Sequence, residues 1–179
     1  KYYASDVTRT FPVSGKFTEP QRAIYQLVLD AMMASIDEVR PGVPFNVFHD
    51  TATRVLAQGL IDLGIVSGTL EEVLENRDFA KYTIHKTGHW LGLDVHDMGS
   101  YAGNEGPRAF EPGMITTVEP GLYFTEDDVD IDPKWRGIAV RIEDNILVTT
   151  DGNRNLSEGI AKTIEDVESV CAGHTAACV

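Results

Sequence analysis

Three of the five histidines in this 179-residue chain, His85, His89 and His96, lie within twelve positions of one another. Gly88 and Gly92 are interleaved with them, so the segment is a better candidate for a functional loop than for a regular buried element. Imidazole is a common nitrogen ligand of transition metals and titrates near neutral pH. We therefore interpret the three histidines as a functional cluster and not as isolated structural residues.

Three carboxylates add to this chemistry: Asp6, Glu119 and Glu143. Glu119 and Glu143 have large apolar neighbours in the sequence, and an unpaired charge is costly in such surroundings. Several converging carboxylates with one imidazole form a ligand set that suits manganese, cobalt, iron or zinc, and two carboxylates can bridge a pair of such ions. The residue chemistry predicts a dinuclear metal hydrolase. A solvated sheet face with ordinary surface charges is the alternative.

Predicted strands position these carboxylates. Polar and apolar residues alternate over 6–11, which predicts a strand with Asp6 on its polar face. Residues 114–119 form a second predicted strand, and Glu119 stands at its end. Residues 138–148 alternate in the same way, and we predict one longer strand there.

Helices separate the first strand from the others. Three are predicted from capping residues and helical apolar spacing: Thr18 to residue 40, Asn46 to Gly64, and Thr69 to Asn76. His49 lies on the second helix, and we interpret it as a partly exposed surface histidine and not as a ligand, since nothing in its local spacing provides a partner. The order of elements predicts an α+β domain in which helices cover one face of a mainly antiparallel sheet.

The overall composition excludes several classes of protein. Fifteen Lys plus Arg against 28 Asp plus Glu give a formal net charge of −13, which argues against a nucleic-acid partner. We find no apolar run of the roughly 20 residues that a membrane helix needs. The two cysteines, Cys171 and Cys178, fall in the last nine residues, so a disulfide framework is excluded and a reducing, cytoplasmic location is predicted. With His174 they could bind a stray metal, but we interpret this end as a tail.

The same residues carry a resemblance to a known family. The motifs are Asp6-x-Thr8-Arg9, His85-x-x-Gly88-His89-x-x-Gly92-x-x-x-His96-Asp97, Glu111-Pro112-Gly113, Glu119-Pro120-Gly121-Leu122-Tyr123, and Arg141-Ile142-Glu143-Asp144. In this order they resemble the "pita-bread" metallopeptidases, and most closely the Xaa-Pro aminopeptidase and prolidase branch. The resemblance covers residues 1 to about 168. It implies the pita-bread fold, a curved antiparallel sheet covered by helices.

Position by position, the resemblance implies a metal-binding set. Asp6 and Glu143 would bridge two divalent metal ions, and His89 and Glu119 would bind one of these ions. The family favours manganese, with cobalt, zinc and iron as alternatives. The ions would lower the pKa of a shared water molecule. Glu119 would then accept its proton.

The resemblance also implies a substrate pocket. His85 and His96 would be catalytic histidines that are not metal ligands, and Arg141 and Tyr123 would lie beside them and bind substrate. His96 or His85 would hydrogen-bond the carbonyl oxygen as it becomes anionic. The expected substrate is a peptide with proline in the second position, the expected reaction is release of the residue before that proline, and a homo-oligomer is expected.

One departure from the family concerns the start of the chain. The family takes a further metal-binding aspartate from a strand that would precede Lys1. We therefore expect a C-terminal catalytic portion over 1–170, lacking its first strands and incomplete on its N-terminal side, and a tail over 171–179. Such a chain alone should bind at most one tight ion, hydrolyse Xaa-Pro peptides poorly and self-associate.

Three alternatives remain. A non-catalytic binding module of the same fold should purify free of metal. A creatinase-like amidinohydrolase should be insensitive to chelators. A mononuclear iron oxygenase is more remote, because it usually has histidine before the acidic residue, whereas here Asp94 precedes His96.

Overall fold

The computed structural model describes residues 2–173. The helices are α1 (Glu19–Glu38), α2 (Val47–Asp62), α3 (Leu70–Asn76) and α4 (Ile164–Cys171), with 3₁₀ turns η1 (Asp78–Lys81) and η2 (Pro133–Trp135). The strands are β1 (Ala102–Gly103), β2 (Gly106–Pro107), β3 (Ile115–Val118), β4 (Gly121–Tyr123), β5 (Ala139–Arg141), β6 (Asp144–Val148) and β7 (Asn153–Asn155). The predicted α+β class is confirmed.

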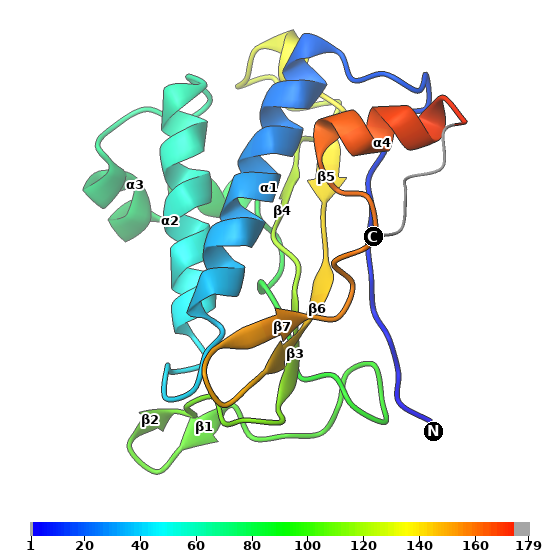
Figure 1. Cartoon of the computed structure of the whole chain (residues 1–179). Coiled ribbons are helices and arrows are strands. Elements are labelled where there is room, and N and C mark those ends of the chain that lie inside the picture. Colours follow the sequence, from blue (N-terminus) through cyan, green and yellow to red (C-terminus); the bar gives the residue numbers. More distant parts are fainter. Residues whose placement is uncertain (1, 174–179) are drawn as a thin grey trace.

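The three helices predicted from the sequence are present. Thr18 and Thr69 each form a full capping box at the start of α1 and α3, in which the side chain accepts from a backbone N–H of the first turn. α1 and α2 pack side by side, and α1 also contacts β3, β4 and β5, so the helices cover one face of the strands (Figure 1). Within residues 2–173, no helix is long and apolar enough to cross a membrane.

The strands pair antiparallel in the order β3-β6-β7, and β4 pairs with β5. The single strand predicted over 138–148 is wrong, because the structure divides it into β5 and β6 around Ile142 and Glu143. Pro120 lies across from this break and has no N–H to donate to a ladder. Glu143 donates its own N–H outward, to the carbonyl oxygen of Thr8 over 3.1 Å.

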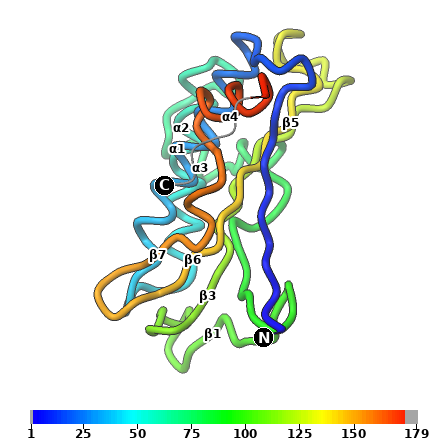
Figure 2. The backbone as a smooth tube through the Cα atoms, turned by 45° about the vertical axis from the view of Figure 1, so that its right-hand side comes forward, coloured from blue at the N-terminus to red at the C-terminus, as the bar shows by residue number. Residues whose placement is uncertain are grey.

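The N-terminal segment runs alongside β5 and β6 but forms no regular strand. Figure 2 shows the segment in blue, beside β5 in its upper part and beside a green loop near the N-terminus. The strand predicted over 6–11 is therefore wrong as a regular element. Next to the bond between Glu143 and Thr8, the Thr10 hydroxyl donates to the carbonyl oxygen of Arg141 and accepts from its N–H. These side-chain bonds stand where a regular ladder would have backbone bonds. A side chain thus interrupts the ladder here.

Alternation along the central strands separates the core from the other face. Val118, Leu122, Val140 and Ile142 are all at most 3% exposed and belong to the cluster that packs against α1. The residues between them face the opposite side of the sheet. The limits predicted for the domain, 1–170, and for the tail, 171–179, stay a prediction; α4 ends at Cys171, and the residues from His174 onward lie outside the described part.

Candidate metal centre

The broken ladder brings two candidate ligands directly opposite each other. The pairs that flank the break keep one register: Val118 with Asp144, and Gly121 with Arg141. That register places Glu119 across from Glu143 on the face away from the helices, where directly opposed side chains touch. Glu119 is 7% exposed and Glu143 is 1% exposed. Two carboxylates so close and so buried repel each other unless a cation lies between them.

His89 belongs to a segment, residues 87–91, that pairs with the outer edge of β3. Thr117 and Glu119 donate their backbone N–H groups to carbonyl oxygens of this segment over 3.0 and 2.7 Å. Gly88 permits this close approach, because a Cβ there would lie 2.1 Å from the carbonyl oxygen of Thr117. His89 therefore lies in a further extended segment next to Glu119, and Gly88 allows that segment to approach β3 closely.

His89 directs a lone pair at two carboxylates. Its Nδ1 lies 3.0 Å from the carbonyl oxygen of Trp90, which can only accept, so the neutral ring carries its proton on Nδ1. Its Nε2 lies 3.4 Å from Asp6 Oδ2 and 3.4 Å from Glu119 Oε1. Three acceptors that face one another are stable when they share a cation, so this arrangement fits a metal ion.

Glu143 gives independent support for a cation. Thr8 donates its hydroxyl to Oε2 over 2.6 Å, while Oε1 is buried and has no hydrogen-bond partner among the described residues. Burial raises the pKa of Glu143 to about 7, opposed by the bond from Thr8 and reinforced by the negative charge of Glu119. A carboxylate that is buried with one oxygen unsatisfied is readily stabilised by a positive ion.

The four carboxylate and imidazole groups predicted to bind metal converge. Two groups of ligand atoms each lie within 4.8 Å of one another: His89 with Glu119 and Glu143, and Asp6 with His89 and His96. His89 is common to both groups. The set combines imidazole nitrogen with several carboxylate oxygens, a mixture that suits divalent transition metals. The structure adds His96 to this neighbourhood, which the sequence places outside the ligand set.

Arg141 and Thr117 fix the orientation of Glu119. Arg141 Nη1 donates to Oε2 over 3.2 Å, and the Thr117 hydroxyl donates to Oε1 over 3.2 Å. Arg141 stands two residues before Glu143 and therefore on the same face of the sheet. Its side chain is 40% exposed, but its Nε is buried and has no hydrogen-bond partner among the described residues.

His85 and Tyr123 form a pair at the side of the site. His85 Nδ1 lies 2.8 Å from the carbonyl oxygen of Lys86, so in the neutral ring Nε2 accepts from the Tyr123 hydroxyl, 2.6 Å away. Burial raises the pKa of Tyr123, which keeps that hydroxyl protonated. A Cβ at Gly121 would lie 2.6 Å from the Tyr123 hydroxyl oxygen, so the side chain can fold back only over a glycine.

These residues open into a cleft of about 550 Å³. Its lining comprises Ile84, His85, Lys86, Gly88, His89, His96, Tyr101, Glu119 and Arg141. The His96 ring packs against the His89 ring with centroids 4.3 Å apart. Tyr123 is not among the lining residues and contacts the cleft through His85. The structure therefore brings together the predicted ligands and the predicted pocket residues.

Some residues of this site were missed from the sequence. Thr8 and Thr117 each stand two positions from a candidate carboxylate, so strand alternation could have indicated them. Tyr101 offered no signal: its hydroxyl accepts the N–H of Trp90 over 3.2 Å from a distant loop. His49 is partly exposed, as expected, but its Nδ1 lies 2.8 Å from the hydroxyl of Thr87, a partner 38 residues away. Burial lowers the pKa of His49, which lies outside both candidate ligand groups.

This chain is closely similar in sequence to several known proteins. Residues 1–150 match the model of metallopeptidase family M24. Xaa-Pro aminopeptidase 1 of Streptomyces coelicolor is 51% identical over 172 residues, 93% of this chain and 34% of the relative. Xaa-Pro aminopeptidase of Haemophilus influenzae is 48% identical over 168 residues, 94% of this chain and 39% of the relative. The chain thus spans between a third and two fifths of the length of these curated relatives.

Solved structures of aminopeptidases are also similar to this chain. Aminopeptidase PepP of Pseudomonas aeruginosa superimposes with a TM-score of 0.94 at 45% identity, over 96% of this chain and 39% of that protein. Zinc-substituted aminopeptidase P of Escherichia coli in complex with product gives 0.90 at 43% identity, over 96% and 38%. The same Escherichia coli enzyme with the inhibitor Pro-Leu gives 0.90 at 43% identity, over the same shares. The expected pita-bread fold is confirmed, and the chain belongs to metallopeptidase family M24.

Proposed function

We propose that this chain forms the catalytic centre of an Xaa-Pro aminopeptidase, which removes the N-terminal residue that precedes proline. The observation that carries the proposal is the lone pair of His89 Nε2, directed at Asp6 and Glu119 over 3.4 Å each. An ordinary solvated polar face would not direct three hydrogen-bond acceptors at one another. The names of the curated relatives and the product and Pro-Leu complexes of aminopeptidase P support a peptide with proline in the second position as substrate.

The proposed ligands are Asp6, His89, Glu119 and Glu143, which would hold two divalent ions. Family M24 is a family of metallopeptidases. We propose manganese as the metal on the family resemblance, with cobalt, zinc and iron as alternatives. When bound, the ions supply an activated water molecule at neutral pH and polarise the scissile carbonyl.

Glu119 moves the proton of the attacking water. Oε1 faces His89 Nε2, and Oε2 accepts from Arg141 Nη1 over 3.2 Å. Arg141 thereby orients the carboxylate toward the cleft, where Glu119 accepts the proton. Arg141 and Tyr123 also contribute to binding of the substrate.

The hydrogen bonds distinguish the two histidines of the cleft. His85 Nε2 is already engaged by the Tyr123 hydroxyl, so it cannot donate to a carbonyl oxygen without losing that bond. We therefore assign to His96 the donor role toward the developing negative charge on the carbonyl oxygen. In this arrangement His85 carries no proton on Nε2 to give, so we assign protonation of the leaving proline nitrogen to Glu119, which holds the proton taken from the water.

The proposal also covers the location and the oligomeric state of the protein. We propose a cytoplasmic enzyme, on the support of the two cysteines confined to the last nine residues. We propose a homo-oligomer on the family resemblance.

Substrate selectivity under metal control tests the function. The protein that carries this chain should release alanine from Ala-Pro-Ala at least about a hundredfold faster than from Ala-Ala-Ala, and a chelator should abolish release until Mn²⁺ is restored. Turnover that survives the chelator, together with hydrolysis of creatine, would favour the amidinohydrolase alternative. A protein that neither binds divalent metal nor cleaves either peptide would favour the binding module.

A further inference from the structure

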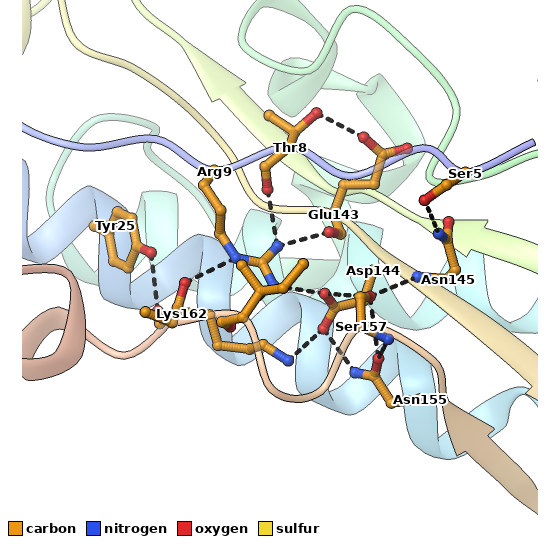
Figure 3. A network of polar contacts seen from close by, with 12 residues as sticks. Ser5, Thr8, Arg9, Tyr25, Glu143, Asp144, Asn145, Asn155, Ser157 and Lys162 are labelled. Atoms are coloured by element: carbon orange, nitrogen blue, oxygen red, sulfur yellow. Dashed lines mark hydrogen bonds and ion pairs between the residues drawn. The ribbon is translucent and has the colours of Figure 1, made fainter. Parts of the chain in front are cut away.

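A buried carboxylate lies on the opposite side of the sheet from the candidate metal site. Asp144 directly follows Glu143, so its side chain points toward the helices, and it is 0% exposed. Two cations meet it: Arg9 Nη2 lies 2.6 Å from Oδ1, and Lys162 Nζ lies 2.5 Å from Oδ2. Ser157 and Asn155 also donate to it, over 2.7 and 2.6 Å (Figure 3). This cluster satisfies a charge that would otherwise be costly to bury.

Arg9 does more than neutralise Asp144. Its Nη1 donates to the carbonyl oxygens of Thr8 and Glu143, over 2.9 and 2.7 Å. Its Nε donates to the carbonyl oxygen of Ala161 over 2.8 Å. One planar guanidinium therefore ties together the backbones of the two segments that carry Thr8 and Glu143, and Figure 3 shows it lying between them.

The same two segments are joined again on the side of the metal site. There the Thr8 hydroxyl donates to Glu143 Oε2 over 2.6 Å. Because neighbouring residues of an extended chain point to opposite faces, Arg9 with Asp144 and Thr8 with Glu143 join the segments on both faces. Asp6 lies between this junction and a single backbone bond from Ala4 N–H to the Gly92 carbonyl oxygen, and the N-terminal segment has no regular ladder.

We propose that Arg9 is a positioning residue, which sets the separation of the Asp6 and Glu143 carboxylates through its bonds to Asp144 and to the backbone of Thr8 and Glu143. Arg9 touches neither the cleft nor a proposed ligand side chain. Its effect on the site passes through the backbone. The inference deepens the proposed function, because it concerns the same metal site.

Lys162 provides a matched control. It donates to the same buried carboxylate as Arg9 but, among the described residues, makes no side-chain hydrogen bond to the backbone of Thr8 or of Glu143. Arg9→Lys keeps the positive charge next to Asp144 but loses the fork that reaches two carbonyl oxygens. Lys162→Gln removes the other cation and leaves that fork intact. Both changes should destabilise the fold, so thermal unfolding alone would not separate them.

Metal binding separates the two roles. Outer residues that orient metal ligands typically change metal affinity by about 10- to 100-fold. Calorimetric titration with Mn²⁺ should show an affinity at least about tenfold weaker for Arg9→Lys and within about threefold of the parent for Lys162→Gln. The metal-induced rise in the midpoint of thermal unfolding should shrink only for Arg9→Lys. Equal affinities for Arg9→Lys and the parent, or equal losses in the two variants, would overturn the proposal.

A second readout does not depend on metal. Hydrogen exchange of the Glu143 amide reports its bond to the Thr8 carbonyl oxygen. It should accelerate in Arg9→Lys more than in Lys162→Gln, and equal rates would overturn the positioning role. If the parent binds no Mn²⁺, the proposed function fails, while this exchange comparison still decides the role of Arg9. Should Arg9→Lys not fold, Asp144→Asn, which removes the partner carboxylate charge, replaces it in the same measurements and carries the same expectations.

Discussion

The hydroxyl of Thr8 donates to Oε2 of Glu143 over 2.6 Å, while the buried Oε1 of the same carboxylate has no partner among the described residues. Thr8 thus fixes one oxygen of Glu143, and a ligand oxygen of this carboxylate lies within 4.8 Å of ligand atoms of His89 and Glu119. The carboxylate is therefore oriented before any ion binds.

This half-satisfied carboxylate predicts how the stability of metal-free protein depends on pH. Burial raises the pKa of Glu143 from 4.5 to about 7, so the folded state holds a proton that the unfolded chain releases. The stabilisation is fully present below pH 4.5 and is lost as the pH rises to about 7. Denaturant unfolding from pH 4.5 to 8 should show this loss, and Glu143→Gln should remove this component. A parent with the same pH dependence as Glu143→Gln would contradict the prediction.

The proposed role of Glu119 predicts a loss of activity without a loss of fold. In the protein that carries this chain, Glu119→Ala should reduce hydrolysis of an Xaa-Pro peptide to background, because a ligand and a base are removed together. Circular dichroism should remain unchanged. Glu111→Ala is the control, since Glu111 is exposed and pairs only with Arg108 at the surface. Activity of Glu119→Ala within tenfold of the parent would rule out the assignment.

His96 should affect turnover more than metal content. Loss of a donor that stabilises negative charge typically lowers kcat by about 100-fold, and we expect this for His96→Ala with Xaa-Pro peptides. Metal analysis should give the same content as the parent. The alternative is specific: His96 shares a possible ligand group with Asp6 and His89, so a variant that loses metal would identify His96 as a ligand.

Gly88 should be needed for the position of His89. A methyl group there would meet the Thr117 carbonyl oxygen at 2.1 Å, so Gly88→Ala must push residues 87–91 away from β3. Overpacking of this kind costs about 1–3 kcal/mol of unfolding free energy. Metal affinity should fall as well. Gly152→Ala, where nothing lies within 4 Å of the added Cβ, should be nearly neutral in both measurements. Similar values for the two variants would contradict this account.

The helices were predictable because their signals are local. The capping boxes at Thr18 and Thr69 lie within one turn of the helices they begin, and the structure contains both. The break between β5 and β6 was not predictable from residues 138–148, because the residue across from it, Pro120, lies between β3 and β4. The same limit applies to His49, whose partner Thr87 is 38 residues away.

The composition of the candidate site was predictable, but its geometry was not. Asp6, His89, Glu119 and Glu143 were indicated by residue type and motif. The direction of the His89 lone pair follows from the carbonyl oxygen of Trp90, and a backbone contact of this kind leaves no mark in the sequence. Arg9 likewise stands in a recognisable motif, and alternation places it on the face opposite Asp6, but only the structure shows that its guanidinium meets Asp144.

The shared register of β3–β4 and β5–β6 restricts how the chain can change in length. Glu119 and Glu143 face the same side only because each stands at a fixed count of residues from the pairs around the break. One inserted or deleted residue between Ile115 and Tyr123, or between Ala139 and Val148, would turn one carboxylate into the apolar core. The length of the turn at 124–138 does not affect this register, nor does that of the helical stretch between Phe11 and Thr87. Variation in length among relatives should therefore gather in those connections and be absent from the two paired stretches.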